Sequence, residues 1–252
     1  MQGVPAPVGA GGPVLAKYST IEQLSTAIAA RFTKDKTVQG TFSTKLTRGG
    51  TAQTEITGEA ANRIDSAGTS AKISIRQTGG PTDLDGNFDA VALPTEFYVK
   101  LPPAQAIEPG KPWVRATPNG TDPVSKAMGP ALAQIQDASD PLDNVTDAGD
   151  TTIAGSTDEA LDGTPAVRYD LRIDLTKGAK DASTSETFTK LGVRTLEPIV
   201  WLDGQDRLLR FELTVRSPSG VSTLEVSARY RAWGEPVDIT PPPADQVATV
   251  PG

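Results

Sequence analysis

The sequence contains no cysteine and no histidine. It therefore has no disulfide bond and no thiol nucleophile, and it lacks both the commonest general base and the commonest transition-metal ligand. A Ser-His-Asp hydrolase is excluded, and no Gly-x-Ser-x-Gly motif is present. Phosphate-binding and dinucleotide-binding glycine motifs are missing too. We predict a protein without a cofactor that is not an enzyme and acts chiefly by burying apolar surface.

Aromatic residues are scarce as well, at 5% of the chain against 37% apolar residues in total. The interior is thus expected to be aliphatic and lightly filled. No apolar run approaches the roughly 18 residues that a membrane-spanning helix requires. The formal net charge of -7 argues against nucleic acid or an anionic membrane surface as the direct partner.

What the chain does contain is alternation. Residues 164–175 alternate apolar and polar side chains almost without a break, which predicts a strand with one dry and one solvated face. Similar strand patterns continue from residue 37 to residue 233, separated by short turn signals such as Asp203-Gly204. Short connections favour antiparallel pairing, so most of the chain is expected to form one antiparallel sheet.

Two segments change to helical spacing. Ser19-Thr20-Ile21-Glu22 resembles a capping box with Ser19 as the cap, and predicts an amphipathic helix over about 20–34. Asp122-Pro123 predicts the start of a second helix, which carries an apolar stripe through Ile135. A short helix is also expected near 184–191. These elements predict an α+β fold: a large curved antiparallel sheet, or half-barrel, with helices packed on its concave face.

Small residues on the expected dry face bear on what this fold does. They are Gly40, Gly58, Ala60, Ala71, Ala90, Ala92 and Ala228. A tightly filled core would more often use larger side chains, so space is left between sheet and helices unless helix side chains occupy it. Both possibilities stay open from the sequence. We divide the chain into a flexible leader (1–18), a single domain (19–240) and a Pro-rich tail (241–252).

Metal sites are not predicted. Residues 83–87 suggest a calcium loop, but the glycine is displaced and the required carboxylate position holds Pro94, so a turn is favoured. The aspartates between 137 and 150 fall at helical spacing, but Pro141 would disturb a helix, and a solvated acidic loop is favoured.

Three stretches of the C-terminal half carry a family resemblance: residues 198–208 (PIVWLDGQDRL), 210–213 (RFEL) and 230–242 (YRAWGEPVDITPP). They resemble the actinobacterial lipoproteins of the LppX/LprG type, which are related in fold to the LolA and LolB carriers. The resemblance implies a curved half-barrel closed by helices around an apolar cavity for acyl chains. It also implies export and anchoring to the cell membrane, facing outside, through a lipidated N-terminal Cys that this chain does not contain.

We therefore expect a monomeric lipid or glycolipid carrier, with a lipid or acylated glycolipid as ligand and the membrane as a partner through that anchor. The residues expected to line its cavity are Val38, Phe42, Ile56, Ile73, Ile75, Phe97, Val99, Met128, Leu132, Tyr169, Leu171, Ile173, Phe211 and Leu213. The alternative is a cell-envelope interaction module with a filled core and no ligand, supported by the Pro-rich segment 236–251. A glycosidase that uses only carboxylates is the third and weakest possibility.

Overall fold

The computed structural model describes residues 15–79, 86–117, 120–126, 142, 146–179 and 182–250. Its named helices are α1 (Ile21–Asp35), α4 (Ala182–Lys190) and the short 3-10 helices η1 (Pro103–Gln105) and η2 (Ala244–Gln246). Its strands are β1 (Thr37–Arg48), β2 (Thr51–Asp65), β3 (Gly68–Gly79), β4 (Gly86–Ala92), β5 (Phe97–Lys100), β6 (Trp113–Ala116), β7 (Asp150–Leu161), β8 (Thr164–Asp174), β9 (Thr195–Leu196), β10 (Ile199–Asp203), β11 (Leu208–Arg216), β12 (Ser222–Arg231) and β13 (Val247–Ala248).

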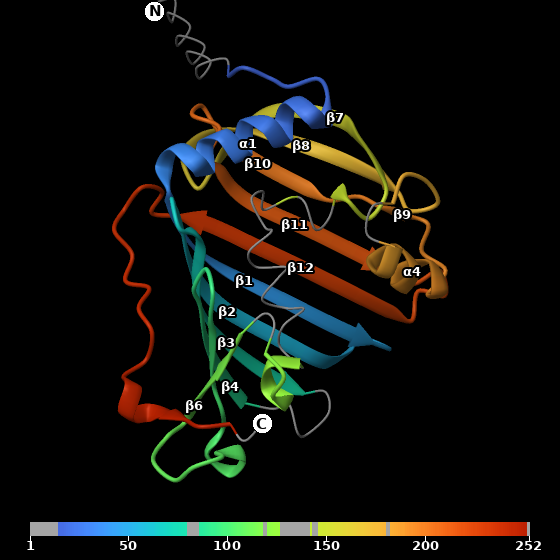
Figure 1. Cartoon of the computed structure of the whole chain (residues 1–252). Helices are drawn as coiled ribbons and strands as arrows, with labels where there is room; N and C mark the ends of the chain where they lie inside the picture. The colour runs from blue at the N-terminus through green and yellow to red at the C-terminus, as the bar shows by residue number, and fades with distance from the viewer. Residues whose placement is uncertain are drawn as a thin grey trace, which may run out of the picture.

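These strands form one open sheet of 13 strands in the order β13-β6-β5-β4-β3-β2-β1-β12-β11-β10-β8-β7, with β9 beside β8. All described pairs are antiparallel except β13 with β6. The sheet consists of two meanders, β1 to β6 and β7 to β12, that meet where β1 pairs with β12. The predicted α+β fold with a large curved antiparallel sheet is confirmed (Figure 1).

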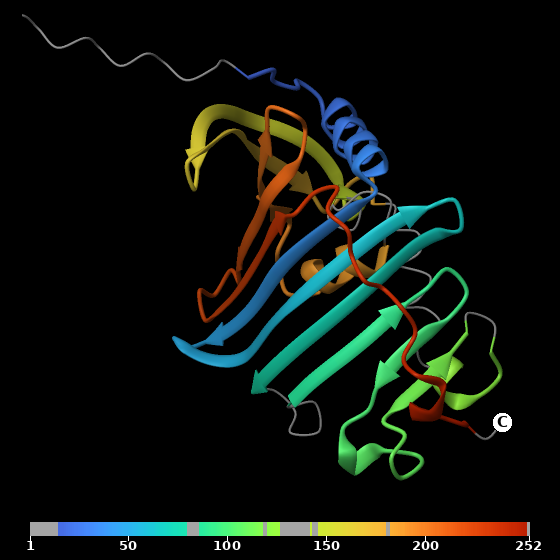
Figure 2. The same cartoon turned by 90° about the vertical axis from the view of Figure 1, so that its left-hand side faces the viewer.

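The register divides the sheet into two faces. Residues directly opposite one another on paired strands point to the same side, so each β1 residue fixes the side of its partners. The apolar face holds Val38, Gly40, Phe42, Thr44 and Leu46 together with the residues paired to them. The polar face holds the residues that alternate with these. Both α1 and α4 lie on the apolar side, and the sheet curves around that side (Figures 1 and 2).

Helix α1 is amphipathic, as predicted, and buries Leu24, Ile28 and Phe32 against the apolar face. Its cap differs from the prediction by one residue. The Thr20 hydroxyl, not that of Ser19, accepts the hydrogen bond from the backbone N–H of Gln23, at 3.3 Å. The Gln23 side chain accepts from the backbone N–H of Ser19, the residue before the cap, so Gln23 takes the place expected for Glu22.

The second predicted helix begins where the sequence placed it. The backbone N–H of Ser125 donates to Oδ1 of Asp122 at 2.9 Å, and residues 123–126 are helical. The rest of its apolar stripe, including Met128 and Leu132, lies outside the described residues, as do the 83–85 part of the calcium-like loop and most of the acidic loop. No described helix combines the length and hydropathy needed to cross a membrane.

The segment that follows β12 covers part of the polar face. Ile239, only 2% exposed, packs with Val91 of β4 and Tyr98 of β5. In Figure 2 this segment, in red, crosses the sheet on the side turned to the viewer and reaches β6, which it extends as the parallel strand β13. The stretch from residue 241 thus takes part in the sheet, whereas the sequence suggested only an extended tail.

Candidate functional site

Twelve of the fourteen residues predicted to line a cavity lie on one face of one sheet, as the register shows. Paired residues form rows that run across the strands on this face. One such row consists of Phe211, Ala228, Phe42, Gly58 and Ile75. The other two predicted residues, Met128 and Leu132, lie outside the described part. The alternation in the sequence therefore assigned the correct side of each strand.

Most of these side chains already pack in one of two closed clusters. The larger cluster joins α1 to strands β8, β10 and β11, and contains Val38, Tyr169, Leu171, Ile173, Phe211 and Leu213. The smaller cluster joins strands β3 to β6 and contains Phe97 and Val99, with Ile73 partly buried against it. Leu171 is 2% exposed and Ile173 is 0% exposed, so these residues form a fixed wall in this structure.

Between the clusters, the apolar face is only half-buried. We call this region the central lane and define it by Phe42, Ile56, Ile75, Leu224 and Val226. Within the described residues, the first three belong to neither cluster, whereas Leu224 and Val226 rest against the larger one. Leu46 continues the lane toward the end of β1 and is 39% exposed. The lane is thus one part of the described face that has apolar surface left for another molecule.

A glycine shapes the lane. The ring of Phe42 lies over Gly58, its partner on β2, so closely that an added Cβ would overlap the ring. The same Cβ would stand 2.6 Å from the backbone oxygen of Ser74. Because Gly58 lacks a side chain, the Phe42 ring packs directly against the backbone of β2 and does not protrude far from the sheet.

Two tyrosine hydroxyls, of Tyr18 and Tyr169, lie on the part of the apolar face next to α1. The Tyr169 hydroxyl accepts a hydrogen bond from the backbone N–H of Tyr18 at 3.1 Å, and the Tyr18 hydroxyl donates to Asp206 at 2.7 Å. Burial, together with the hydrogen bond to Asp206, raises the pKa of Tyr18 to about 12. Burial also raises the pKa of Tyr169. Near neutral pH both phenols are uncharged, so this end of the apolar face carries no phenolate.

Three consecutive residues of the turn between β10 and β11 contact α1 and the segment that precedes it. Gln205 contacts Arg31, Asp206 contacts Tyr18, and Arg207 contacts Asp35. Asp35 receives Arg31 Nε at 2.8 Å and Arg207 Nε at 3.0 Å on one carboxylate oxygen. The hairpin predicted from Asp203-Gly204 therefore exists and also positions the helix that covers the larger cluster.

The five residues that define the central lane all have apolar side chains. Among the described residues, no group of three or more acidic side chains could hold a metal ion. Leu224 and Val226 are the lane residues that the sequence analysis did not single out. Their alternation along β12 was available as a signal, since Ala228 on the same strand was assigned to this face.

Comparisons with known proteins bear on the fold. No protein-family model matches the sequence, and no curated protein does. The crystal structure of LprF from Mycobacterium bovis superposes on 89% of this chain and 99% of its own, with a TM-score of 0.50 and 16% identity. This chain has the LprF fold. The resemblance to lipoproteins of the LppX/LprG type, drawn from the sequence, is thereby confirmed at the level of fold.

Two other solved structures match less closely. A DUF1329 family protein from Desulfovibrio piger has a TM-score of 0.34 at 14% identity, and covers 85% of this chain and 93% of its own. A LolA superfamily protein, NE2245 from Nitrosomonas europaea, has a TM-score of 0.30 at 10% identity with the same coverage. At these identities and TM-scores neither structure carries an argument about function.

Proposed function

We propose that this protein is a non-catalytic lipid-binding protein of the cell envelope, which holds the acyl chains of a lipid or acylated glycolipid against the apolar face. The central lane carries the proposal, because it combines half-buried aliphatic and aromatic side chains with walls that are already packed. Each methylene moved from water onto such a surface contributes about 0.8 kcal/mol, so no catalytic group is needed for affinity.

Within this proposal the predicted lining residues have two roles. Phe42, Ile56 and Ile75 contact the acyl chain directly, since they are half-buried and outside both clusters. Tyr169, Leu171 and Ile173 form the wall that bounds it on the α1 side. Met128 and Leu132, which the sequence also predicts as lining residues, lie outside the described residues.

The resemblance to LppX/LprG-type lipoproteins extends the proposal to the cell. We propose that the protein is exported, that a lipid anchor holds it at the cell membrane facing outside, and that it works as a monomer. We also propose a single domain from 19 to 240, to whose sheet the segment from 241 adds strand β13.

Native mass spectrometry after gentle purification from the source cells tests the proposal. We expect an adduct with the mass of a lipid, which extraction with organic solvent removes. A protein that carries no such adduct, and that takes up no fatty acid or phospholipid on incubation, would favour the interaction module with a filled core.

A pair of variants locates the binding surface. Ile56→Lys places a charge in the central lane, and we expect lipid occupancy to fall about tenfold because a buried ammonium is costly beside an acyl chain. Thr78→Lys is the matched control, since Thr78 is exposed on the opposite face of the neighbouring strand. Equal occupancy in both variants would contradict the placement. Leu171 is less suitable, because a charge at a residue 2% exposed tests folding rather than binding.

A further inference from the structure

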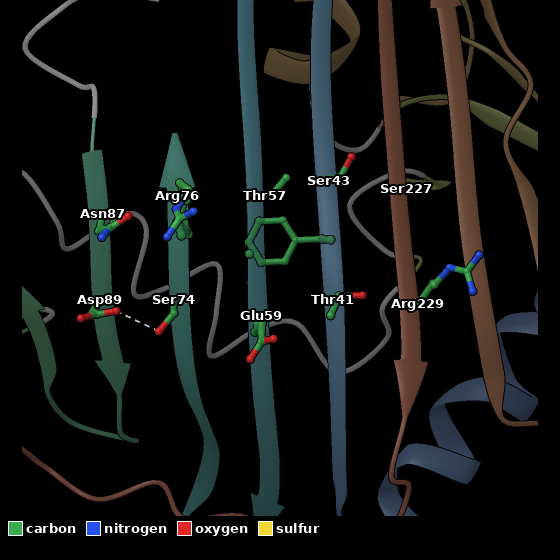
Figure 3. A pocket seen from close by; sticks show the side chains of 13 residues that line it. Thr41, Ser43, Thr57, Glu59, Ser74, Arg76, Asn87, Asp89, Ser227 and Arg229 are labelled. Atoms are coloured by element: carbon green, nitrogen blue, oxygen red, sulfur yellow. Dashed lines mark hydrogen bonds between the residues drawn. The ribbon is translucent and has the colours of Figure 1, made fainter. Parts of the chain in front are cut away.

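The polar face holds a depression that the lipid proposal does not use. It is a hollow of about 650 Å³ that extends over strands β12, β1, β2, β3 and β4, near the middle of the sheet (Figure 3). This size lies within the range of small-molecule sites. We call it the polar basin and define it by Thr41, Ser43, Thr57, Glu59, Arg76 and Ser227.

Side-chain length explains the hollow. Ser227, Ser43 and Thr57 are direct neighbours across three strands, and all three are short. Longer side chains stand at the ends of the basin, where Arg229 and Arg76 come from β12 and β3. The row of short hydroxyl-bearing residues between them leaves a trough that runs across the strands.

The groups at the edge of the basin are already engaged, whereas those within it are not. Asp89 accepts from Ser74 at 2.8 Å and pairs with Lys100 at 3.4 Å, and Arg229 pairs with Asp162 at 2.7 Å. By contrast, Glu59, Arg76 and the hydroxyls of the basin have no hydrogen-bond or ion-pair partner among the described residues. A set of donors and acceptors therefore faces one hollow with its bonding capacity free.

The chemistry of these groups selects a ligand class. The charges of the lining balance, because it includes two guanidinium groups, from Arg76 and Arg229, and two carboxylates, from Glu59 and Asp89. A polyanion would meet both carboxylates, and an apolar ligand would leave the free hydroxyls unpaired. A neutral chain rich in hydroxyl groups matches hydroxyl, carboxylate and guanidinium groups alike.

We propose that the polar basin binds an oligosaccharide chain, laid across the strands. The four strands from β12 to β3, spaced about 4.8 Å apart, give the trough a length of roughly 14 Å, which suits a few sugar rings in a row. The lane and the basin lie on opposite sides of the sheet, so sugar binding does not depend on the lipid proposal.

Titration by NMR with neutral oligosaccharides, namely maltoheptaose, mannohexaose and cellohexaose, tests this site. We expect at least one to bind with a Kd between about 0.1 and 10 mM, since hydrogen bonds to exposed groups supply only modest net affinity. Shifted amide signals should concentrate at residues of the basin. No binding by any of the three up to about 10 mM, or shifts confined to another surface, would overturn the proposal.

Two matched pairs of variants identify the contacts. Glu59→Gln should weaken sugar binding about tenfold by removing a charge-assisted acceptor, whereas Glu55→Gln, on the same strand and face but outside the basin, should leave it unchanged. Ser43→Tyr should fill the trough and abolish binding, while Thr47→Tyr on the same strand and face should not.

Lipid occupancy, measured on the same proteins, separates the two proposals. It should stay constant in all four variants, because their side chains face away from the central lane. Equal sugar binding by the basin variants and their controls would show that the sugar binds elsewhere, and would overturn the assignment of this site.

Discussion

At the scale of single residues, the carboxylate of Asp35 links α1 to the sheet. Its burial favours the protonated form, but hydrogen bonds and charges from Arg207 and Arg31 outweigh that effect, and the pKa of Asp35 is lowered. A carboxyl whose pKa is lower in the folded state stabilises the fold above its unfolded pKa. That contribution is lost as the pH falls through the folded value.

We therefore expect a pH-dependent effect of Asp35→Asn. The variant should have a lower free energy of unfolding than the wild type at pH 7. The difference should shrink as the pH falls from the ordinary range of an aspartate carboxyl toward the lowered pKa of Asp35, where the carboxyl is protonated in the folded state too. Urea denaturation at a series of pH values measures it. Asp238→Asn, at an exposed position of the C-terminal segment, is the control. A difference independent of pH would mean that the ion pairs do not stabilise the fold.

Gly58 supports a second prediction at this scale. Gly58→Ala should lower the free energy of unfolding by about 1–3 kcal/mol, because the new methyl group overlaps the Phe42 ring and the backbone of β3. Gly155→Ala in β7 is the matched control, since an added Cβ there meets nothing nearer than 3.7 Å. Equal stability of the two variants, measured by urea denaturation, would show that the ring moves aside without cost.

At the scale of elements, the start of α1 allows a test of which of two neighbouring hydroxyls, Ser19 or Thr20, caps the helix. Thr20→Ala should cost about 1 kcal/mol of stability, because it removes the acceptor for the Gln23 backbone N–H. Ser19→Ala should cost clearly less, although the sequence favoured Ser19 as the cap. Thermal unfolding followed by circular dichroism compares the two. The opposite ranking would return the cap to Ser19.

The elements also show what periodicity predicts. The long strands β1, β2, β8 and β11 were found from alternation, because each has one face richer in apolar side chains and one richer in polar side chains. The short strands β6 and β13 were not predicted. β6 has four residues and β13 only two, and β13 pairs in parallel with a strand far away in the sequence. Such pairing depends on where the C-terminal segment crosses the sheet, and the order of residues within the segment does not indicate that position.

At the scale of the whole molecule, the sequence predicted on which face of the sheet a side chain lies, but not how deeply that side chain is buried. Tyr169 and Ile56 share the same alternating phase, yet Tyr169 is 1% exposed whereas Ile56 is half-buried. The difference comes from packing by distant segments: α1 covers the β8 end, while the middle strands lie between two clusters. The polar basin was not predicted either. The side chains around this hollow come from five strands, and their arrangement depends on how those strands pair.

The pairing of β1 with β12 has a consequence for how the chain reaches this structure. Each meander assembles from neighbours in sequence, but their junction brings together positions as far apart as Thr37 and Glu235, which share a hydrogen bond across 198 positions. Closing so long a loop carries an entropic penalty before any contact compensates it. During refolding the two halves can therefore form early and separately, with this seam as the slow, last step.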